Sequence, residues 1–234
     1  AILIEGAAER LLLPDMINKC EKRGFFTEKS PALSSQYCSL IEVGGAYAHR
    51  FFEMVDFLEI PTLILTDIDF VDIHGKSCQK QCADRTSNST VIRWCHDVFD
   101  IPISNSIKID KVNELAMDEQ KRTNGLRHIE FQVEENSYHP RSLEESIINV
   151  NRKEFGLADD IEEITFDDEN EKKTNFAIRL LVEEEFDNYK IPLYIKNGLI
   201  WLNQQSKMPD TLIPKRKKKR RYTKKVEVVN SGKE

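Results

Sequence analysis

Two stretches of the chain decide the fold, Ala1-Ile-Leu-Ile-Glu5-Gly-Ala-Ala-Glu9 and Ile60-Pro-Thr-Leu-Ile-Leu-Thr-Asp67-Ile-Asp69. Each is a short run of β-branched residues and leucine that ends abruptly in acidic residues, which is typical of a buried strand in a parallel sheet. Open α/β sheets place their chemistry at the carboxyl ends of such strands. The two stretches therefore predict four carboxylates at one edge of a parallel sheet.

Spacing within each stretch strengthens this prediction. Glu5 and Glu9 are four residues apart, across Gly6 and the start of a helix, so both lie over one turn. Asp67 and Asp69 are two apart at a strand end and point the same way. Crowded carboxylates repel one another unless a cation lies among them, and oxygen ligands suit magnesium, manganese or calcium. Either stretch alone fits an ordinary turn or helix cap, but together they favour a divalent-metal site.

Strand and helix signals alternate through the first hundred residues. We expect strands at residues 2–4, 39–43 and 62–65, and helices at residues 7–20 and 46–58. The second helix is amphipathic, with Tyr47, Phe51, Met54, Val55 and Leu58 as its apolar residues. A long loop over residues 71–85 should precede a helix that Thr86 or Ser87 caps and that runs to about residue 98. This alternation predicts an α/β fold with a parallel sheet covered on both faces.

The pattern changes after residue 100. We expect helices at residues 111–117, from a Ser142 cap to about residue 152, and at residues 176–185 and 194–203. A strand is predicted at residues 126–133, and an acidic connector at residues 158–172. The interpretation is a core of residues 1–105, a mostly helical elaboration over residues 106–210 that completes it, and a basic tail over residues 211–234.

Further motifs follow in a distinctive order. They are Val43-Gly-Gly-Ala-Tyr-Ala-His49-Arg-Phe51, Thr86-Ser-Asn88, Arg141-Ser-Leu-Glu144-Glu145, Lys173-Thr-Asn-Phe-Ala177 and Ile191-Pro-Leu-Tyr-Ile-Lys-Asn-Gly-Leu-Ile-Trp-Leu202. A glutamate after the first strand and Asp-x-Asp after a later one resemble the TOPRIM fold of topoisomerases, primases and several nucleases. Over roughly residues 1 to 205, the chain resembles the C-terminal TOPRIM nuclease region of the OLD (overcoming lysogenization defect) family of ATP-dependent endonucleases.

The resemblance implies a metal-dependent DNA endonuclease or nickase that uses two metal ions. Asp67 and Asp69 would bind one ion, and Glu5 and Glu9 would bind the other or bridge to it, with Glu5 also counted as catalytic. Glu144 would complete the acid set. Its neighbour Glu145 is less favoured, because it also fits a helix start near the positive end of the helix dipole.

The resemblance also implies that Lys173 stabilises charge in the transition state or protonates the leaving group. The chain has Asn175 where the family usually has Asp, and Lys172 stands adjacent. Two alternatives stay open for each remaining polar position. Ser87 and Asn88 would face the metal edge through water or cap a helix, and His49 would bind phosphate or lie at an ordinary interface.

The formal charge of −6 hides an asymmetry between body and tail. Residues 215–234 carry ten Lys/Arg and two Glu, a net charge of +8, which leaves −14 for residues 1–214. The body would therefore need metal ions or a local basic patch to bind DNA. The tail is interpreted as a disordered DNA contact or a tether to the acidic body. The clustered tail residues that would contact DNA are Lys215, Arg216, Lys217, Lys218, Lys219, Arg220 and Arg221.

Other features set the expected context. No Walker lysine follows Gly44-Gly45, so no nucleotide site is expected in this chain. The resemblance implies that ATP binds an upstream ABC-type ATPase, through which the protein forms homo-oligomers. The start within a strand, without Met, suggests a fragment. Neither a leader nor an apolar run of ~20 residues is visible, so no membrane association is expected. The resemblance implies a setting in bacterial or phage cytoplasm, in antiphage defence or DNA processing.

Five cysteines, an odd number, favour free thiols in a reducing compartment. A zinc site from His74, Cys78, Cys82 and Cys95-His96 is a weaker alternative. Two other functions also compete with the nuclease. One is a TOPRIM module that binds nucleic acid or a partner without cutting. The other is a phosphatase similar to haloacid dehalogenases, with Asp67 as the nucleophile of Asp67-Ile-Asp-Phe-Val71.

Overall fold

The computed structural model describes residues 1–26, 30–158, 163–166 and 171–205. Its core is a five-stranded sheet in the order β2-β1-β3-β8-β7, in which the first four strands are parallel and β7 is antiparallel. The strands are β1 (Ile2–Ile4), β2 (Leu40–Glu42), β3 (Thr62–Leu65), β7 (Thr123–Asn124) and β8 (Arg127–Glu130). The predicted α/β class with a parallel sheet is confirmed.

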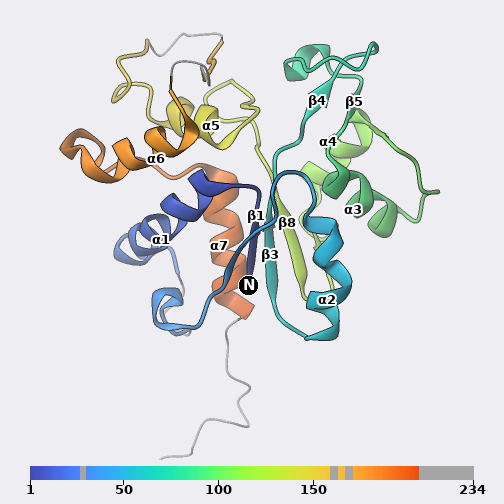
Figure 1. The fold of residues 1–234 in the computed structure, drawn as a ribbon, viewed down its shortest axis with the longest axis horizontal. Coiled ribbons are helices and arrows are strands. Elements are labelled where there is room, and N and C mark those ends of the chain that lie inside the picture. The colour runs from blue at the N-terminus through green and yellow to red at the C-terminus, as the bar shows by residue number, and fades with distance from the viewer. Residues whose placement is uncertain (27–29, 159–162, 167–170, 206–234) are drawn as a thin grey trace, which may run out of the picture.

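Helices cover both faces of this sheet, as Figure 1 shows. One face carries α1 (Ala7–Lys22) and α7 (Leu193–Gln205), and α5 (Leu143–Val150) and α6 (Lys173–Val182) extend the same apolar cluster beyond the ends of the strands. The other face carries α2 (Phe52–Phe57), α3 (Ser89–Phe99) and α4 (Ile109–Met117). Successive strand residues alternate between the two sides, because side chains in a strand point to opposite faces. Ile2 and Ile4 thus pack in one apolar cluster and Leu3 in the other.

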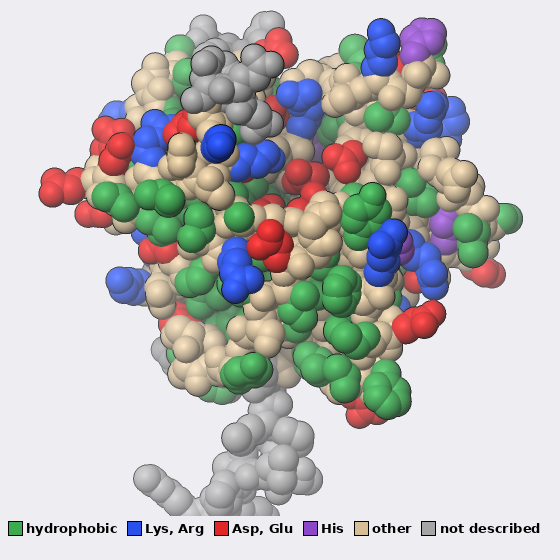
Figure 2. All heavy atoms as spheres, in the orientation of Figure 1, with side chains coloured by type: hydrophobic (Ala, Val, Ile, Leu, Met, Phe, Trp, Pro, Cys, Tyr) green, Lys and Arg blue, Asp and Glu red, His purple; other side chains and the backbone are tan. Residues whose placement is uncertain are grey.

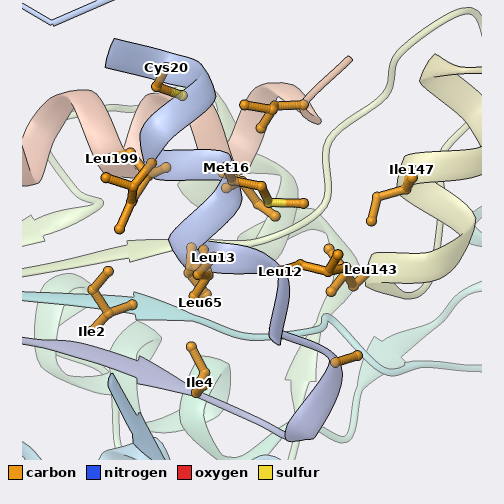
Figure 3. Packing of buried hydrophobic residues seen from close by; sticks show 14 of the residues in the cluster. Ile2, Ile4, Leu12, Leu13, Met16, Cys20, Leu65, Leu143, Ile147 and Leu199 are labelled. Carbon is orange, nitrogen blue, oxygen red and sulfur yellow. The ribbon is translucent and has the colours of Figure 1, made fainter. Parts of the chain in front are cut away.

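The packing of α1 and α7 on the sheet is close (Figure 3). Leu12, Leu13 and Met16 of α1 are fully buried against strand residues and against Leu199 of α7. At Gly198 the helix approaches so closely that an added Cβ would lie 2.7 Å from Leu63 Cδ1. A side chain at this position would overlap the sheet, so this glycine allows α7 to lie directly on β3 and β8.

A second, smaller sheet was not expected from the sequence. Strands β4 (Phe70–Val71), β5 (Arg85–Thr86) and β6 (Ile107–Lys108) pair antiparallel in that order. The prediction of one long loop over residues 71–85 is therefore wrong at its two ends. Strands of two residues are too short to produce a recognisable alternation of apolar and polar residues.

Most other predicted elements are confirmed, with shifted ends. Residues 2–4 and 62–65 are strands as expected, and the first helix extends two residues beyond the expected end. Residues 46–58 differ more: a 3₁₀ turn at Ala48–Phe51 precedes the short α2. Phe52 and Val55 are its buried residues, whereas Tyr47, Met54 and Leu58 of the expected apolar set are exposed.

Elements after residue 105 contribute directly to the core. β8 pairs with β3 in the middle of the sheet, and α7 packs against both strands. The boundary at residue 105 stays a prediction about domain organisation. No helix within the described ranges is long and apolar enough to cross a membrane.

Candidate active site

The carboxyl ends of β1 and β3 bring Glu5 next to Asp67. The two strands are parallel neighbours, with Ile2 opposite Leu63. Glu5 Oε1 accepts a hydrogen bond from the backbone N–H of Asp67 at 3.1 Å, and another from the Thr66 hydroxyl. Residues 62 positions apart therefore meet at one sheet edge, as the two acid-tipped stretches predict.

Asn88 joins the acids of the two strands. It precedes α3, and its Oδ1 accepts hydrogen bonds from the backbone N–H groups of Thr90 and Val91. Its fully buried amide also donates to Glu5 Oε1 at 3.3 Å and to Asp69 Oδ2 at 3.1 Å. Asn88 is thus the helix cap, in place of the expected Thr86 or Ser87, and it also contacts the acids directly.

The Asp67-Ile-Asp69 segment turns sharply at its last residue. Asp69 has φ = 56°, in the left-handed region that aspartate tolerates better than most residues. The exposed Ser87 contacts only the backbone of this turn among the described contacts, with its N–H 3.1 Å and its hydroxyl 3.4 Å from Asp69 O. Ser87 therefore supports the turn rather than the carboxylates.

Asp67 is held by a residue that the sequence reasoning missed. Gln132 Nε2 donates a hydrogen bond to Asp67 Oδ1, and Gln132 is 1% exposed. Tyr194 of α7 is also buried beside these acids, and burial together with the charges of Asp67 and Glu9 raises its pKa well above the usual value. A polar residue two positions beyond a buried strand was the available signal for Gln132.

Glu9 and Glu144 complete the group of acids. Glu9 lies in the first turn of α1, and Glu144 lies 1% exposed in the first turn of α5. Burial, with the charges of Glu144 and Glu5, raises the pKa of Glu9 to about 7 despite a local backbone hydrogen bond and Lys173. Burial and the charge of Glu5 likewise raise the pKa values of Asp67 and Asp69. Burial is the largest cause of these shifts, and repulsion among the acids adds to it.

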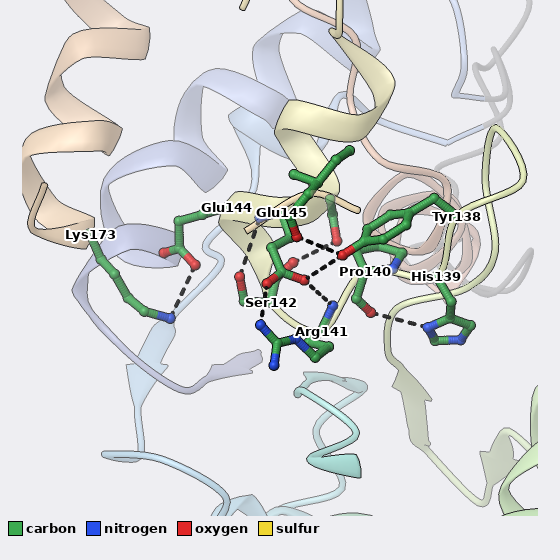
Figure 4. A network of polar contacts seen from close by, with 10 residues as sticks. Tyr138, His139, Pro140, Arg141, Ser142, Glu144, Glu145 and Lys173 are labelled. Carbon is green, nitrogen blue, oxygen red and sulfur yellow. Dashed lines mark hydrogen bonds and ion pairs between the residues drawn. The ribbon is translucent and has the colours of Figure 1, made fainter. Parts of the chain in front are cut away.

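Lys173 supplies a cation at this group. It is the first residue of α6, and its Nζ lies 3.1 Å from Glu144 Oε2 (Figure 4). The same α5 turn directs Glu145 elsewhere: its carboxylate accepts from the backbone N–H of Arg141 at 2.8 Å and from Arg141 Nη2 at 2.9 Å. Of the two consecutive glutamates, the one that contacts Lys173 is Glu144.

A cavity of about 260 Å³ opens beside these side chains. Figure 2 shows acidic side chains in a hollow of this face, with basic side chains around it. The cavity is lined by Asp67, Asp69, Phe70, Ser77, Arg141, Ser142, Glu145, Phe166 and Lys173. Because acidic side chains line this cavity beside Lys173, a negatively charged ligand could enter only together with cations.

Among the remaining predicted positions, His49 lies apart from this cavity. His49 lines a separate cavity with Arg93, and its backbone N–H is 3.4 Å from Thr90 Oγ1. Burial and the charges of Arg50 and Arg93 lower the pKa of His49. The basic residues 215–221 lie outside the described residues. All five cysteines are free thiols, and Cys95 is buried in the core.

The acidic side chains at this sheet edge are of the ligand type that a hard divalent cation prefers. They offer carboxylate oxygens, and a divalent cation would offset both the buried charge and the mutual repulsion that raise their pKa values. In the described residues, however, no three Asp, Glu, His or Cys side chains are grouped closely enough to hold an ion. The acids instead bond to Asn88, Gln132 and Lys173. The side chains fit the ion by charge and ligand type, and they would have to turn towards it.

Divalent ions should therefore stabilise this protein more at high pH than at low pH. Because the folded-state pKa of Glu9 is raised to about 7, its contribution to stability is present below its ordinary pKa and is lost as pH rises through 7. Magnesium at ~100 times its dissociation constant should raise the melting temperature by roughly 5–10 °C at pH 8. The shift should be much smaller at pH 5.5. Thermal melts with and without magnesium measure this, and an equal shift at both pH values contradicts the expectation.

Carboxylates from adjacent parallel strands and their covering helices, around a Rossmann-like sheet, are arranged as in a TOPRIM domain. Residues 1–69 match the family model described as "Overcoming lysogenization defect protein-like, TOPRIM domain". Endonuclease GajA of Bacillus cereus (strain HuB5-5) is 26% identical over 233 residues, which cover 86% of this chain and 31% of that protein. The resemblance to the OLD family is thereby confirmed, and the chain spans about a third of the length of this relative.

Proposed function

We propose that this chain is the nuclease part of an OLD-type endonuclease and hydrolyses DNA phosphodiester bonds with divalent metal ions. The observation that carries the proposal is that Glu5, Asp67 and Asp69 meet at one sheet edge. Lys173 lines the cavity that Asp67 and Asp69 also line. The likeness to a TOPRIM domain and to an endonuclease supports a nuclease.

The acids have the role of metal ligands in this proposal. Asp67 and Asp69 would bind one ion and Glu5 and Glu9 the other, with Glu144 completing the set. Two bound ions supply an activated water and neutralise charge on the phosphate and on the leaving oxygen. Magnesium and manganese suit such carboxylate sites, and calcium is the third candidate.

Lys173 and the neutral residues would organise the acids. The Lys173 ammonium offsets the buried charge of Glu144 and stands in the cavity where a phosphate would gain charge during hydrolysis. Asn88 and Gln132 fix the carboxylates of Asp69 and Asp67 by hydrogen bonds. Such outer partners orient ligands and are expected to tune metal affinity.

The rest of the biological setting is also proposed. The relative is about three times as long as the matched region, which supports a further part of the protein, here an upstream ABC-type ATPase that binds ATP and joins the subunits. DNA is the proposed substrate, and residues 215–221 would add nonspecific contacts to its phosphates. A role in bacterial antiphage defence or DNA processing, in the cytoplasm, follows from the family.

Plasmid cleavage across metal ions tests the proposed function. Supercoiled plasmid should be nicked or linearised with magnesium or manganese and should stay intact with EDTA. Asp67→Ala should remain inactive with every ion, because it removes a proposed ligand charge. Asp187→Ala, which removes an exposed acid elsewhere, is the matched control and should cleave normally. Cleavage that persists in EDTA, or in Asp67→Ala, would refute the proposal, and DNA binding without cleavage would favour a non-catalytic module.

A further inference from the structure

The cavity beside the acids contains a second cation that has no part in the metal site. Arg141 and Lys173 both line it. Each is paired with one of two consecutive glutamates in the first turn of α5, Lys173 with Glu144 and Arg141 with Glu145 (Figure 4). Two different cations are therefore fixed at the walls of one cavity.

The guanidinium of Arg141 is held in place, but not all of its N–H groups have a hydrogen-bond partner among the described residues. Its Nη2 donates to Glu145 Oε1 at 2.9 Å, and its Nε is buried without a hydrogen-bond partner among the described residues. Figure 4 shows one terminal nitrogen directed towards Glu145 and the other away from it. A guanidinium carries five N–H donors. Nε is buried and Nη2 donates to Glu145, so the Nη1 donors are the ones without a hydrogen bond among the described residues that a ligand could use.

Glu145 does not need the guanidinium in order to be satisfied. Its Oε2 also accepts from the backbone N–H of Arg141 at 2.8 Å and lies 3.3 Å from the Tyr138 hydroxyl, which shares its single proton with Ile164 O at 2.7 Å. The 3% exposed carboxylate is thus anchored from several sides. An anchored carboxylate fixes the direction of Arg141, which favours a positioning role for Glu145.

The surroundings of Arg141 match a phosphate group. Ser142 and Ser77 line the cavity with Arg141. The Ser142 Oγ accepts the N–H of Glu145 at 3.2 Å, which leaves its hydroxyl proton available for donation. A planar guanidinium with hydroxyls beside it is suited to binding two phosphate oxygens at once. Asp67 and Asp69 line the same cavity, so a phosphate here would lie close to the proposed metal ligands.

We propose that Arg141, oriented by Glu145, binds a DNA phosphate in the cavity beside Asp67 and Asp69. This inference rests on the proposed nuclease function and adds a phosphate subsite to it. Because each phosphate contact with a cation releases bound counterions, the contact should appear in the salt dependence of DNA affinity.

The test is DNA affinity across salt concentrations for Arg141→Ala, Arg141→Lys and wild type. A labelled duplex is titrated in calcium, and gels check that it stays intact. Arg141→Ala should weaken binding roughly tenfold or more. It should also reduce the slope of log affinity against log salt by about 0.9, the value for one phosphate contact. Arg141→Lys should keep the slope, because the charge remains, while losing affinity because a lysine cannot bind two oxygens at once.

Controls separate this contact from a loss of structure. Lys19→Ala removes a cation that pairs with Asp15, four residues away in α1, and should leave both affinity and slope unchanged. If Arg141→Ala fails to fold, Arg141→Gln keeps a hydrogen-bond donor for Glu145, and its DNA affinity is measured across salt concentrations in the same way. An unchanged slope in folded Arg141→Ala or Arg141→Gln that still cleaves plasmid overturns the inference and leaves the nuclease function. A reduced slope in a protein that never cleaves supports the subsite and refutes the nuclease function.

Discussion

Asp67→Asn is expected to abolish plasmid cleavage and, in the absence of metal, to raise the melting temperature by several degrees. Burial and the charge of Glu5 raise the pKa of Asp67, so its ionised form is unfavourable in the folded protein. Asparagine removes that charge, and its Oδ1 can still accept the Gln132 hydrogen bond. The variant should gain stability and lose activity together, as is common where a functional site is strained.

Two melts and one cleavage assay measure this result. Magnesium should stabilise the wild type and leave Asp67→Asn nearly unchanged, because a ligand charge is gone. Asp187→Asn, at an exposed position, should differ from the wild type in neither assay. An Asp67→Asn variant that is less stable without metal than the wild type contradicts the account of repulsion among the acids.

Lys173→Ala is expected to reduce the cleavage rate by roughly a hundredfold or more while DNA affinity changes little. Its ammonium lies 3.1 Å from Glu144 and lines the cavity with Asp67 and Asp69, where it can stabilise charge on a reacting phosphate. The side chain is about half exposed, at 46%, so the substitution should leave the fold intact. Single-turnover cleavage at saturating DNA isolates the rate from binding.

Lys172→Ala is the matched control, because it removes a neighbouring lysine outside the lining of the cavity. It should cleave at the wild-type rate. Magnesium titration should show that Lys173→Ala still responds to the ion, unlike Asp67→Asn. If Lys172→Ala is inactive and Lys173→Ala is active, the role belongs to the adjacent lysine. If both variants cleave normally, neither lysine acts on the transition state.

The strand ends could be predicted from the sequence because their signal is local. Glu5 and Asp67 each follow a run of apolar residues, and parallel neighbours must place their carboxyl ends together. The partners of these acids could not be predicted in the same way. Gln132 and Tyr194 come from distant segments, and only the pairing of β3 with β8 and the packing of α7 bring them to Asp67.

Local sequence was also ambiguous where two similar residues are adjacent. Glu144 and Glu145 both fit the start of a helix, but consecutive helix residues point about 100° apart, so they reach different partners. The contacts with Lys173 and Arg141 distinguish them only once the tertiary structure is known. The same holds for Asn88: its cap could be confused with Thr86 or Ser87 because all three side chains can cap a helix.

The exposed positions of α2 show a further limit. Val55 is buried as expected, whereas Tyr47, Met54 and Leu58 of the same apolar pattern are exposed and Phe52, outside the pattern, is buried. The helix begins as a 3₁₀ turn, with three residues per turn, so the face that reaches the core shifts from the one expected for a regular helix.

Anomalous diffraction from crystals soaked in manganese tests the central claim most directly, because it locates bound ions without relying on activity. The account predicts manganese peaks at the carboxyl ends of β1 and β3, within ligand distance of carboxylates among Glu5, Asp67 and Asp69, and no such peaks in Asp67→Ala crystals soaked in the same way. Wild-type crystals with well-ordered acids and no manganese at this sheet edge, at a concentration that supports cleavage, would contradict it.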